Sequence, residues 1–188
     1  MKGWMLAVAV AAGCASSAGA ADCVNGAGDV GAIVCGDPEL AALDREASRL
    51  STIAEGAGAE HDWLADRDDC ITAHDPKLCL RDAYLERIVD LRGNAPKAAA
   101  DKDGISIGPL AVHCEGLPEM HVTFVNAPEA LAYLATGSDP LVMVQGRSAD
   151  GARYVAEKDG GQWVFWNKGD AATFSRPGKP DSQCKIAG

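Results

Sequence analysis

The sequence predicts an α+β fold in which a small disulfide-linked helical module precedes a small antiparallel β-barrel or sandwich of about eight strands. Three observations predict this fold. Residues 23–93 repeat apolar side chains at helical spacing, residues 109–188 hold short β-rich runs separated by turn residues, and six cysteines follow an N-terminal export signal. Each part is too small to depend on core burial alone, so disulfides are expected to stabilise it.

The first 20 residues have the pattern of a secretory signal peptide. Lys2 precedes an apolar stretch at residues 5–12, and residues 18–20, AGA, form a small-x-small cleavage pattern. A second route is open because residues 11–14 resemble a lipobox, in which Cys14 becomes the lipidated first residue, although the usual leucine is missing. Either route exports the chain. The apolar stretch is shorter than the roughly 20 residues that span a bilayer, so no membrane-spanning helix is expected.

Cysteine usage agrees with an oxidising compartment. The chain has 7 cysteines, and removal or lipidation of Cys14 leaves an even set. Six cysteines allow about 15 connectivities, but the spacing suggests that neighbours pair in order. The expected bridges are Cys23 with Cys35, Cys70 with Cys79, and Cys114 with Cys184. Each would typically add about 2 to 4 kcal/mol of stability.

The net charge of −10 is concentrated in the first half of the chain. Residues 22–103 carry 18 acidic and 9 basic side chains, whereas residues 104–188 carry 9 and 7. An acidic surface argues against nucleic acid and anionic membranes as partners, and it speeds the encounter with a basic protein. The same charge also keeps an exported protein soluble, so it does not identify a partner by itself.

Three helical segments are predicted before residue 94. The first segment begins with an N-cap and first-turn pair, Asp37 and Pro38, and the third begins with the same kind of pair, Asp75 and Pro76. The second segment is shorter and surrounds Trp63. Apolar side chains of the first recur every three or four residues: Leu40, Leu43, Ala47, Leu50 and Ile53 or Ala54. Those of the third do the same until Gly93 ends the helix: Leu80, Tyr84, Ile88 and Leu91. The segment 21–94 is therefore predicted to be one compact helical domain.

A domain boundary is predicted at residues 95–108, which mix proline, alanine, glycine and charges without a sustained strand pattern. Residues 109–188 form the second predicted domain. Its β-rich runs come at close spacing, as in antiparallel hairpins. They are 110–114, 121–125, 130–134, 141–145, 153–156, 162–166, 171–174 and 182–186.

Motifs that suggest cofactors, metals or catalysis are interpreted as structural. The segment 26–31, GAGDVG, matches a dinucleotide fingerprint, but no strand precedes it, so we interpret it as a flexible bridged loop. Cys70, His74 and Cys79 lack a fourth metal ligand and are better explained by a disulfide. The acidic residues at 66, 68 and 69 lie opposite the apolar stripe, as on a solvated helix face. No cofactor, metal site or catalytic residue is expected.

Two segments of the β-rich half carry a more specific pattern. The first is the run GARY at residues 151–154, and the second is WNKGDA at residues 166–171. With Cys114 before them and Cys184 after them, they resemble the family of membrane-bound inhibitors of c-type lysozyme, called MliC. That family has an S-G-x-x-Y loop, a W-x-K-G loop and a closing cysteine. The resemblance covers about residues 110–187 and implies an eight-stranded antiparallel barrel.

The helical half has a separate resemblance, to the LprI-like N-terminal domain of exported proteins. It covers about residues 23–92. The residues that carry it are Cys35, Asp37, Pro38, Glu39, Leu40, Ala41, Leu43, Asp44, Trp63, Arg67, Cys70, Cys79, Leu80, Tyr84, Arg87 and Ile88. Some proteins of this type are also associated with lysozyme inhibition, so both resemblances imply the same function.

The MliC resemblance implies a lysozyme-binding site on two barrel loops. The contact residues it implies are Ser148, Asp150, Gly151, Lys168 and Gly169, with Tyr154 and Trp166 as structural supports of the loops. In the family, the serine and the lysine reach into the lysozyme cleft, where a retaining glycosidase holds two carboxyl groups about 5 Å apart. Lys168 matches the lysine and is expected to pair with the ionised aspartate of the enzyme.

The serine position departs from the family because Asp150 occupies it. A third carboxylate in the cleft would be repelled unless one of the three is protonated, and the enzyme acid, whose pKa is raised to about 6, can supply that proton. Three outcomes stay open: Asp150 accepts this proton in a hydrogen bond, Ser148 takes the serine's role, or this chain inhibits more weakly.

The resemblances together imply an exported inhibitor of c-type lysozyme that is not an enzyme and needs no cofactor. Its partner is the lysozyme itself. It is expected in the periplasm or cell envelope, either soluble after signal cleavage or anchored through a lipid on Cys14. The alternative is a non-inhibitory envelope scaffold or ligand-binding module, in which the acidic helical domain binds another partner.

Overall fold

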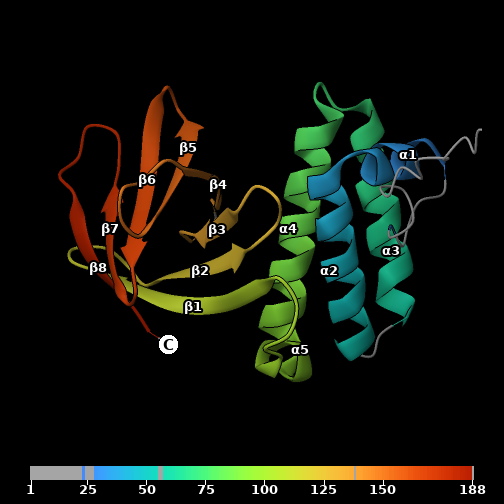
Figure 1. Ribbon diagram of the computed structural model, residues 1–188, viewed down its shortest axis with the longest axis horizontal. Helices are drawn as coiled ribbons and strands as arrows, with labels where there is room; N and C mark the ends of the chain where they lie inside the picture. The colour runs from blue at the N-terminus through green and yellow to red at the C-terminus, as the bar shows by residue number, and fades with distance from the viewer. Residues whose placement is uncertain (1–22, 24–27, 55–56, 138, 188) are drawn as a thin grey trace, which may run out of the picture.

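The computed structural model describes Cys23 and residues 28–54, 57–137 and 139–187 (Figure 1). The expected signal peptide at residues 1–20 and the alternative lipidation site at Cys14 lie outside the described residues. Helices occupy the first part of the chain and a closed barrel the second, as predicted (Figure 1).

The helical part consists of five α-helices and one short 3-10 helix within the described residues. They are α1 (Gly28–Gly36), α2 (Pro38–Ala54), α3 (Ala57–Asp68), η1 (Asp69–Thr72), α4 (Pro76–Asn94) and α5 (Pro96–Ala100). The helix α1 corrects one expectation, because residues 28–31 of the segment interpreted as a flexible loop are helical. Val30 and Val34 of this helix are buried against the helical core, and that burial favours helix despite the glycines.

The two long helices start where the sequence predicts. Asp37 Oδ1 accepts hydrogen bonds from the backbone N–H groups of Glu39 (3.0 Å) and Leu40 (3.2 Å), which caps α2. Asp75 Oδ1 accepts from the backbone N–H of Leu78 (3.1 Å) and caps α4 in the same way. The two helices pack together through their predicted apolar stripes, which are buried: Leu40, Leu43, Ala47 and Leu50 on α2, and Leu80, Tyr84, Ile88 and Leu91 on α4.

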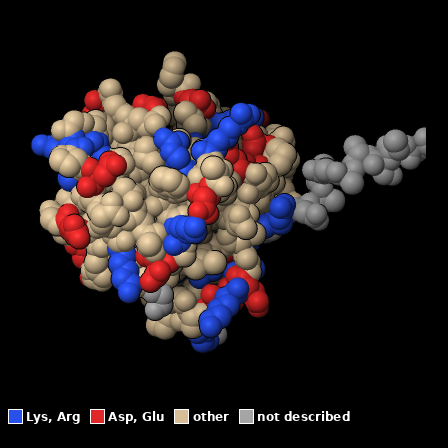
Figure 2. Space-filling model, turned by 60° about the vertical axis from the view of Figure 1, so that its left-hand side comes forward, with Lys and Arg blue, Asp and Glu red and all other residues tan. Residues whose placement is uncertain are grey.

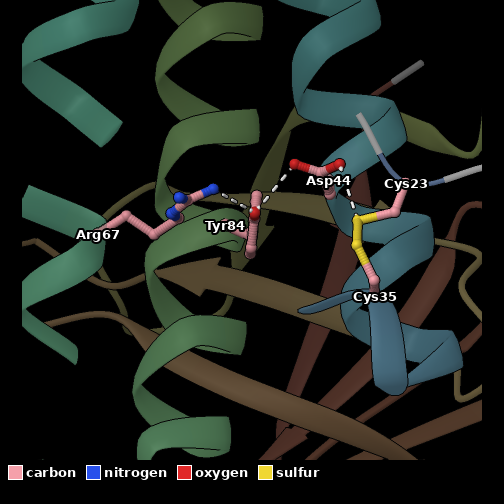
Figure 3. The surroundings of a disulfide bond; sticks show 5 residues. All are labelled: Cys23, Cys35, Asp44, Arg67 and Tyr84. Atoms are coloured by element: carbon pink, nitrogen blue, oxygen red, sulfur yellow. Dashed lines mark hydrogen bonds between the residues drawn. A yellow bond between two sulfur atoms is a disulfide. The ribbon is translucent and has the colours of Figure 1, made fainter. Parts of the chain in front are cut away.

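A row of hydrogen-bonded polar side chains is buried in this helical core (Figure 3). Arg67 Nη1 donates a hydrogen bond to the Tyr84 hydroxyl (2.9 Å), which donates to Asp44 Oδ1 (3.0 Å). The Cys23 sulfur of the Cys23–Cys35 disulfide lies 3.8 Å from Asp44 Oδ2. Burial, and after it the Asp44 carboxylate, raises the pKa of Tyr84. Arg67, Tyr84 and Asp44 belong to the LprI-like pattern, and their mutual hydrogen bonds give them a structural role.

The barrel is closed and antiparallel, with its strands in sequence order and β8 paired to β1. The strands are β1 (Ser106–Cys114), β2 (Met120–Val125), β3 (Leu131–Ala135), β4 (Leu141–Gly146), β5 (Ala152–Lys158), β6 (Gly161–Lys168), β7 (Ala171–Ser175) and β8 (Ser182–Ile186). The sandwich alternative is therefore wrong. Alternate side chains fill the barrel interior, among them Val112, Val122, Leu134, Met143, Phe165 and Phe174.

The three disulfides are those that the spacing suggested: Cys23–Cys35, Cys70–Cys79 and Cys114–Cys184. The first ties Cys23 to α1, and the second ties η1 to α4. The third joins β1 to β8 at directly opposite positions, where the barrel closes. Each bridge stays within one half of the molecule.

The predicted linker at 95–108 is largely structured. Pro96 begins α5, and residues 106–108 already belong to β1, where Ser106 pairs with Val125 and Ile107 with Phe124. The strand pattern is hidden in the sequence because the register shifts between Ile107 and Leu110, which interrupts the alternation of inward and outward side chains.

The two halves share an apolar contact. Helix α4 lies between the barrel and the helices α2 and α3, and it contacts β1 and β3 (Figure 1). Val125, Ala127 and Leu131 of the barrel belong to the same buried cluster as the helical core. Helices therefore cover the outward-facing Val125 of β2 and Leu131 of β3, and the two halves pack against each other.

Candidate functional site

The two loops singled out from the sequence lie next to each other at one end of the barrel. Strands in sequence order put the β2–β3, β4–β5 and β6–β7 connections at the end where β1 begins. The β4–β5 connection is residues 147–151, and the β6–β7 turn is residues 169–170. Lys168 and Asp150 join these connections in an ion pair, with 2.5 Å between Nζ and Oδ2. Their side chains are 73% and 61% exposed, so both charges face solvent.

The β4–β5 connection is held by its own hydrogen bonds. The Ser148 hydroxyl donates to the Asp150 carbonyl oxygen (2.6 Å), and the Asp150 N–H donates to the Ser148 hydroxyl (3.4 Å). Trp166 Nε1 donates to the same Asp150 carbonyl (2.8 Å) and so fastens β6 to this loop. The Ser148 hydroxyl is thus engaged with backbone, while the Asp150 carboxylate points to Lys168.

Glycine at position 151 permits the close approach of the two segments. Gly151 has φ +67°, and a Cβ built there would lie 2.4 Å from the Asn167 carbonyl oxygen. Any other residue would push the β4–β5 connection away from β6. Gly169, at φ +62°, turns the chain between β6 and β7 in open space. The backbone conformations of both loops therefore favour glycine at positions 151 and 169.

The two expected supports occupy different places. Trp166 is 46% exposed and holds the loop through its indole N–H. Tyr154 is 7% exposed and lies inside the barrel, where its ring centroid is 5.4 Å from that of Phe124. Burial raises the pKa of the Tyr154 hydroxyl. Tyr154 thus lines the barrel interior below the loops.

Two further residues at this end were not singled out from the sequence. Ile107 is 62% exposed although it is a large apolar side chain on a strand. Asn167 Oδ1 is buried and has no hydrogen-bond partner in the structure. Both line a cavity of about 230 Å³ at the barrel mouth. Sequence reasoning missed Ile107 because it lies in the expected linker, and Asn167 because it stood between two more conspicuous residues, Trp166 and Lys168.

Charges of both signs are interspersed over the face of the molecule shown in Figure 2, where Lys and Arg alternate with Asp and Glu. Within the described residues, no group of three or more His, Cys, Asp or Glu side chains is arranged to hold a metal ion. None of the described helices combines the length and apolarity needed to cross a membrane.

Comparison with known proteins identifies the barrel. Residues 112–183 match the family described as membrane-bound lysozyme-inhibitor of c-type lysozyme (MliC). These residues form an MliC domain. The matched region begins within β1 and ends within β8, so it contains Asp150, Lys168 and both loops that carry them.

Lipoprotein LprI is a second relative, from Mycobacterium tuberculosis and Mycobacterium bovis. The chain is 34% identical to it over 88 residues, which cover 42% of this chain and 43% of LprI. The chain thus matches less than half the length of these relatives. An LprI-like helical N-terminal part is consistent with this match. Among solved structures, Pseudomonas aeruginosa MliC in complex with hen egg white lysozyme is 30% identical, covering 43% of this chain and 78% of that one, with a TM-score of 0.35.

Proposed function

We propose that this protein inhibits c-type lysozyme by inserting the β4–β5 and β6–β7 connections of its barrel into the enzyme's active-site cleft. The observation that carries the proposal is the exposed Lys168 ammonium, at the tip of a strand in an MliC domain and fastened beside a second ordered loop. Such a protruding cation complements the ionised carboxylate of a retaining glycosidase.

The internal pair between Lys168 and Asp150 does not prevent this role. Exposed ion pairs contribute only about 0 to 1 kcal/mol, so Lys168 can exchange Asp150 for an enzyme carboxylate at small cost. The new pair lies in a water-excluded cleft, where truncation of one partner typically costs about 2 to 5 kcal/mol. Asp150 then faces the protonated enzyme acid and accepts a hydrogen bond from it. Ser148 is a weaker candidate for that contact because its hydroxyl already bonds the loop backbone.

The protein acts as a binder and not as an enzyme in this proposal. The relatives' names, a membrane-bound inhibitor family and a lipoprotein, support a place in the cell envelope. We place the mature chain in the periplasm or on the envelope surface, either soluble after loss of residues 1–20 or lipid-anchored at Cys14. There it would protect the cell wall from lysozyme.

A titration tests the function. Purified mature protein is added in increasing amounts to hen egg white lysozyme, and the lysis of bacterial cell walls is followed by turbidity. The proposal predicts a dose-dependent loss of lysis and a complex of both proteins on gel filtration. Full lysis at a micromolar excess, with no complex, would refute it and favour a non-inhibitory scaffold or ligand-binding module.

A further inference from the structure

We infer that the barrel mouth beside Lys168 is a second contact area for the bound lysozyme, where Ile107 packs against the stem of a basic side chain of the enzyme. The inference rests on the proposed function and deepens it. It also assigns the helical half a role, because that half holds one side of the mouth in place.

The mouth is a cavity next to the loops. Its volume is about 230 Å³, and its lining includes Ile105, Ile107, Phe124, Tyr154 and Asn167. Asn167 precedes Lys168, and Gly151 packs against the backbone of Asn167. A protein that contacts Lys168 and Asp150 therefore comes close to this cavity. The contact area is continuous with the loop site.

The lining combines an exposed apolar side chain with a buried acceptor. Ile107 is 62% exposed, so a partner that covers it would bury further apolar surface. Asn167 Oδ1 has no hydrogen-bond partner, and a buried acceptor without one is costly. A side chain with an apolar stem and a donating head satisfies both groups at once.

Arginine and lysine have this combination, since their methylene stems pack on apolar surface while their heads donate hydrogen bonds. The net charge of −10 lies mainly in the helical half, which borders the mouth, and beside the unpaired acceptor it favours a basic partner over an acidic one. The occupant is therefore a basic side chain on the lysozyme surface beside its cleft.

The helical half holds the rim of the mouth through Glu46 and Arg92. Glu46 of α2, 3% exposed, accepts hydrogen bonds from the backbone N–H groups of Ile105 (3.4 Å) and Ser106 (3.2 Å) and from the Ser106 hydroxyl. Arg92 Nε of α4 donates to that hydroxyl (2.6 Å). The Asn126 N–H donates to the Ile105 carbonyl (2.7 Å) on the other side. The segment that carries Ile107 is thereby tied to two helices.

Substitutions at position 107 of the full-length protein test the inference. The exposed side chain should tolerate change without loss of stability, which thermal unfolding would verify. Ile107→Ser should weaken lysozyme inhibition about 5- to 30-fold, the effect of losing most of one buried isoleucine. Ile107→Lys should weaken it more than Ile107→Glu, because lysine repels a basic occupant. Ile71→Ser, at another exposed isoleucine, on η1 of the helical half, is the matched control and should leave inhibition unchanged.

The outcomes separate the two proposals. If the unmodified protein does not inhibit, the proposed function itself fails. If it inhibits and Ile107→Ser behaves like Ile71→Ser, only the second contact area is wrong. Equal losses in Ile107→Lys and Ile107→Glu would overturn the basic occupant.

Discussion

At the scale of residues, the site depends on one exposed ion pair. Lys168 and Asp150 neutralise each other in the free protein. In the proposed function, each exchanges the other for a partner in the lysozyme cleft. The resemblance to the MliC family was needed to single out both residues, since an exposed lysine before a glycine turn is otherwise ordinary. The contact between them could not be predicted, because it depends on how close two loops come in space.

The substitution Asp150→Ser restores the family residue and frees Lys168 from its internal partner. We expect it to bind lysozyme at least as tightly as the unmodified protein. Inhibition by the unmodified protein should decline as the pH rises through the enzyme acid's pKa of about 6, whereas Asp150→Ser should show a flatter profile. Inhibition constants at pH 5 and pH 8 measure this. A pH-independent unmodified protein would remove the role given to Asp150.

At the scale of elements, helix starts and disulfide pairs could be predicted well because they follow from local signals. Asp37 and Asp75 are N-caps as the sequence indicated, and the spacing of the cysteines suggested all three bridges. The start of β1 could not be predicted, because a register shift breaks its pattern and its ladder partners are distant in sequence. Because the start of β1 was assigned to the linker, Ile107 was not recognised as a strand residue.

The longest and the shortest disulfide loops are expected to contribute differently to stability. Cys114 and Cys184 are separated by 70 residues, and Cys70 and Cys79 by 9. Loop entropy predicts that Cys114→Ala/Cys184→Ala loses about 2 kcal/mol more unfolding free energy than Cys70→Ala/Cys79→Ala. Urea unfolding without reductant measures both. Equal losses would show that the closing bridge does not act through the unfolded chain.

The Glu46 contact between α2 and β1 predicts a pH-dependent stability. Burial raises the pKa of Glu46, but hydrogen bonds from Arg49 and Ser106 outweigh it and hold the pKa below the usual 4.5. Because the folded pKa is lowered, this stabilisation is present above pH 4.5 and is lost as the pH falls through the folded value.

The variant Glu46→Gln isolates this contribution. At pH 7 it should unfold with about 3 kcal/mol less free energy, since it removes the nearer carboxylate of buried Arg92 and leaves only that of Asp101, at 3.9 Å. The difference from the unmodified protein should shrink as the pH falls below 4.5, where Glu46 itself becomes protonated. Urea unfolding at pH 7 and pH 3.5 tests both points, and a difference that stays constant would contradict the account.

At the scale of the whole molecule, the sequence predicts two modules with a linker, and the structure packs them through a shared core. Val125 and Leu131 of the barrel are 1% and 0% exposed beneath the helices. The sequence could not show this contact, because apolar residues on the outer face of a strand have the same alternation as those on the inner face. The helical half therefore affects the stability of the barrel.

Two fragments test whether the stability of the barrel depends on the helical half. Residues 104–188 keep β1 whole, whereas residues 109–188 lack its first three residues. Both expose Val125 and Leu131, so both should unfold at lower temperature than the full chain, and the shorter fragment lower than the longer one. Calorimetry on the oxidised fragments measures this order. If the fragment 109–188 is as stable as the barrel in the full chain, the two halves are independent modules.

The central claim is that Lys168 on the barrel loop inhibits lysozyme by pairing with a carboxylate in its cleft. The most direct measurement is the inhibition constant of Lys168→Ala against hen egg white lysozyme, beside Lys179→Ala, an exposed lysine on the β7–β8 connection at the other end of the barrel. We expect a loss of roughly 30-fold to several thousand-fold for Lys168→Ala, with unchanged thermal unfolding, and no loss for Lys179→Ala. Equal inhibition by Lys168→Ala and the unmodified protein would contradict it.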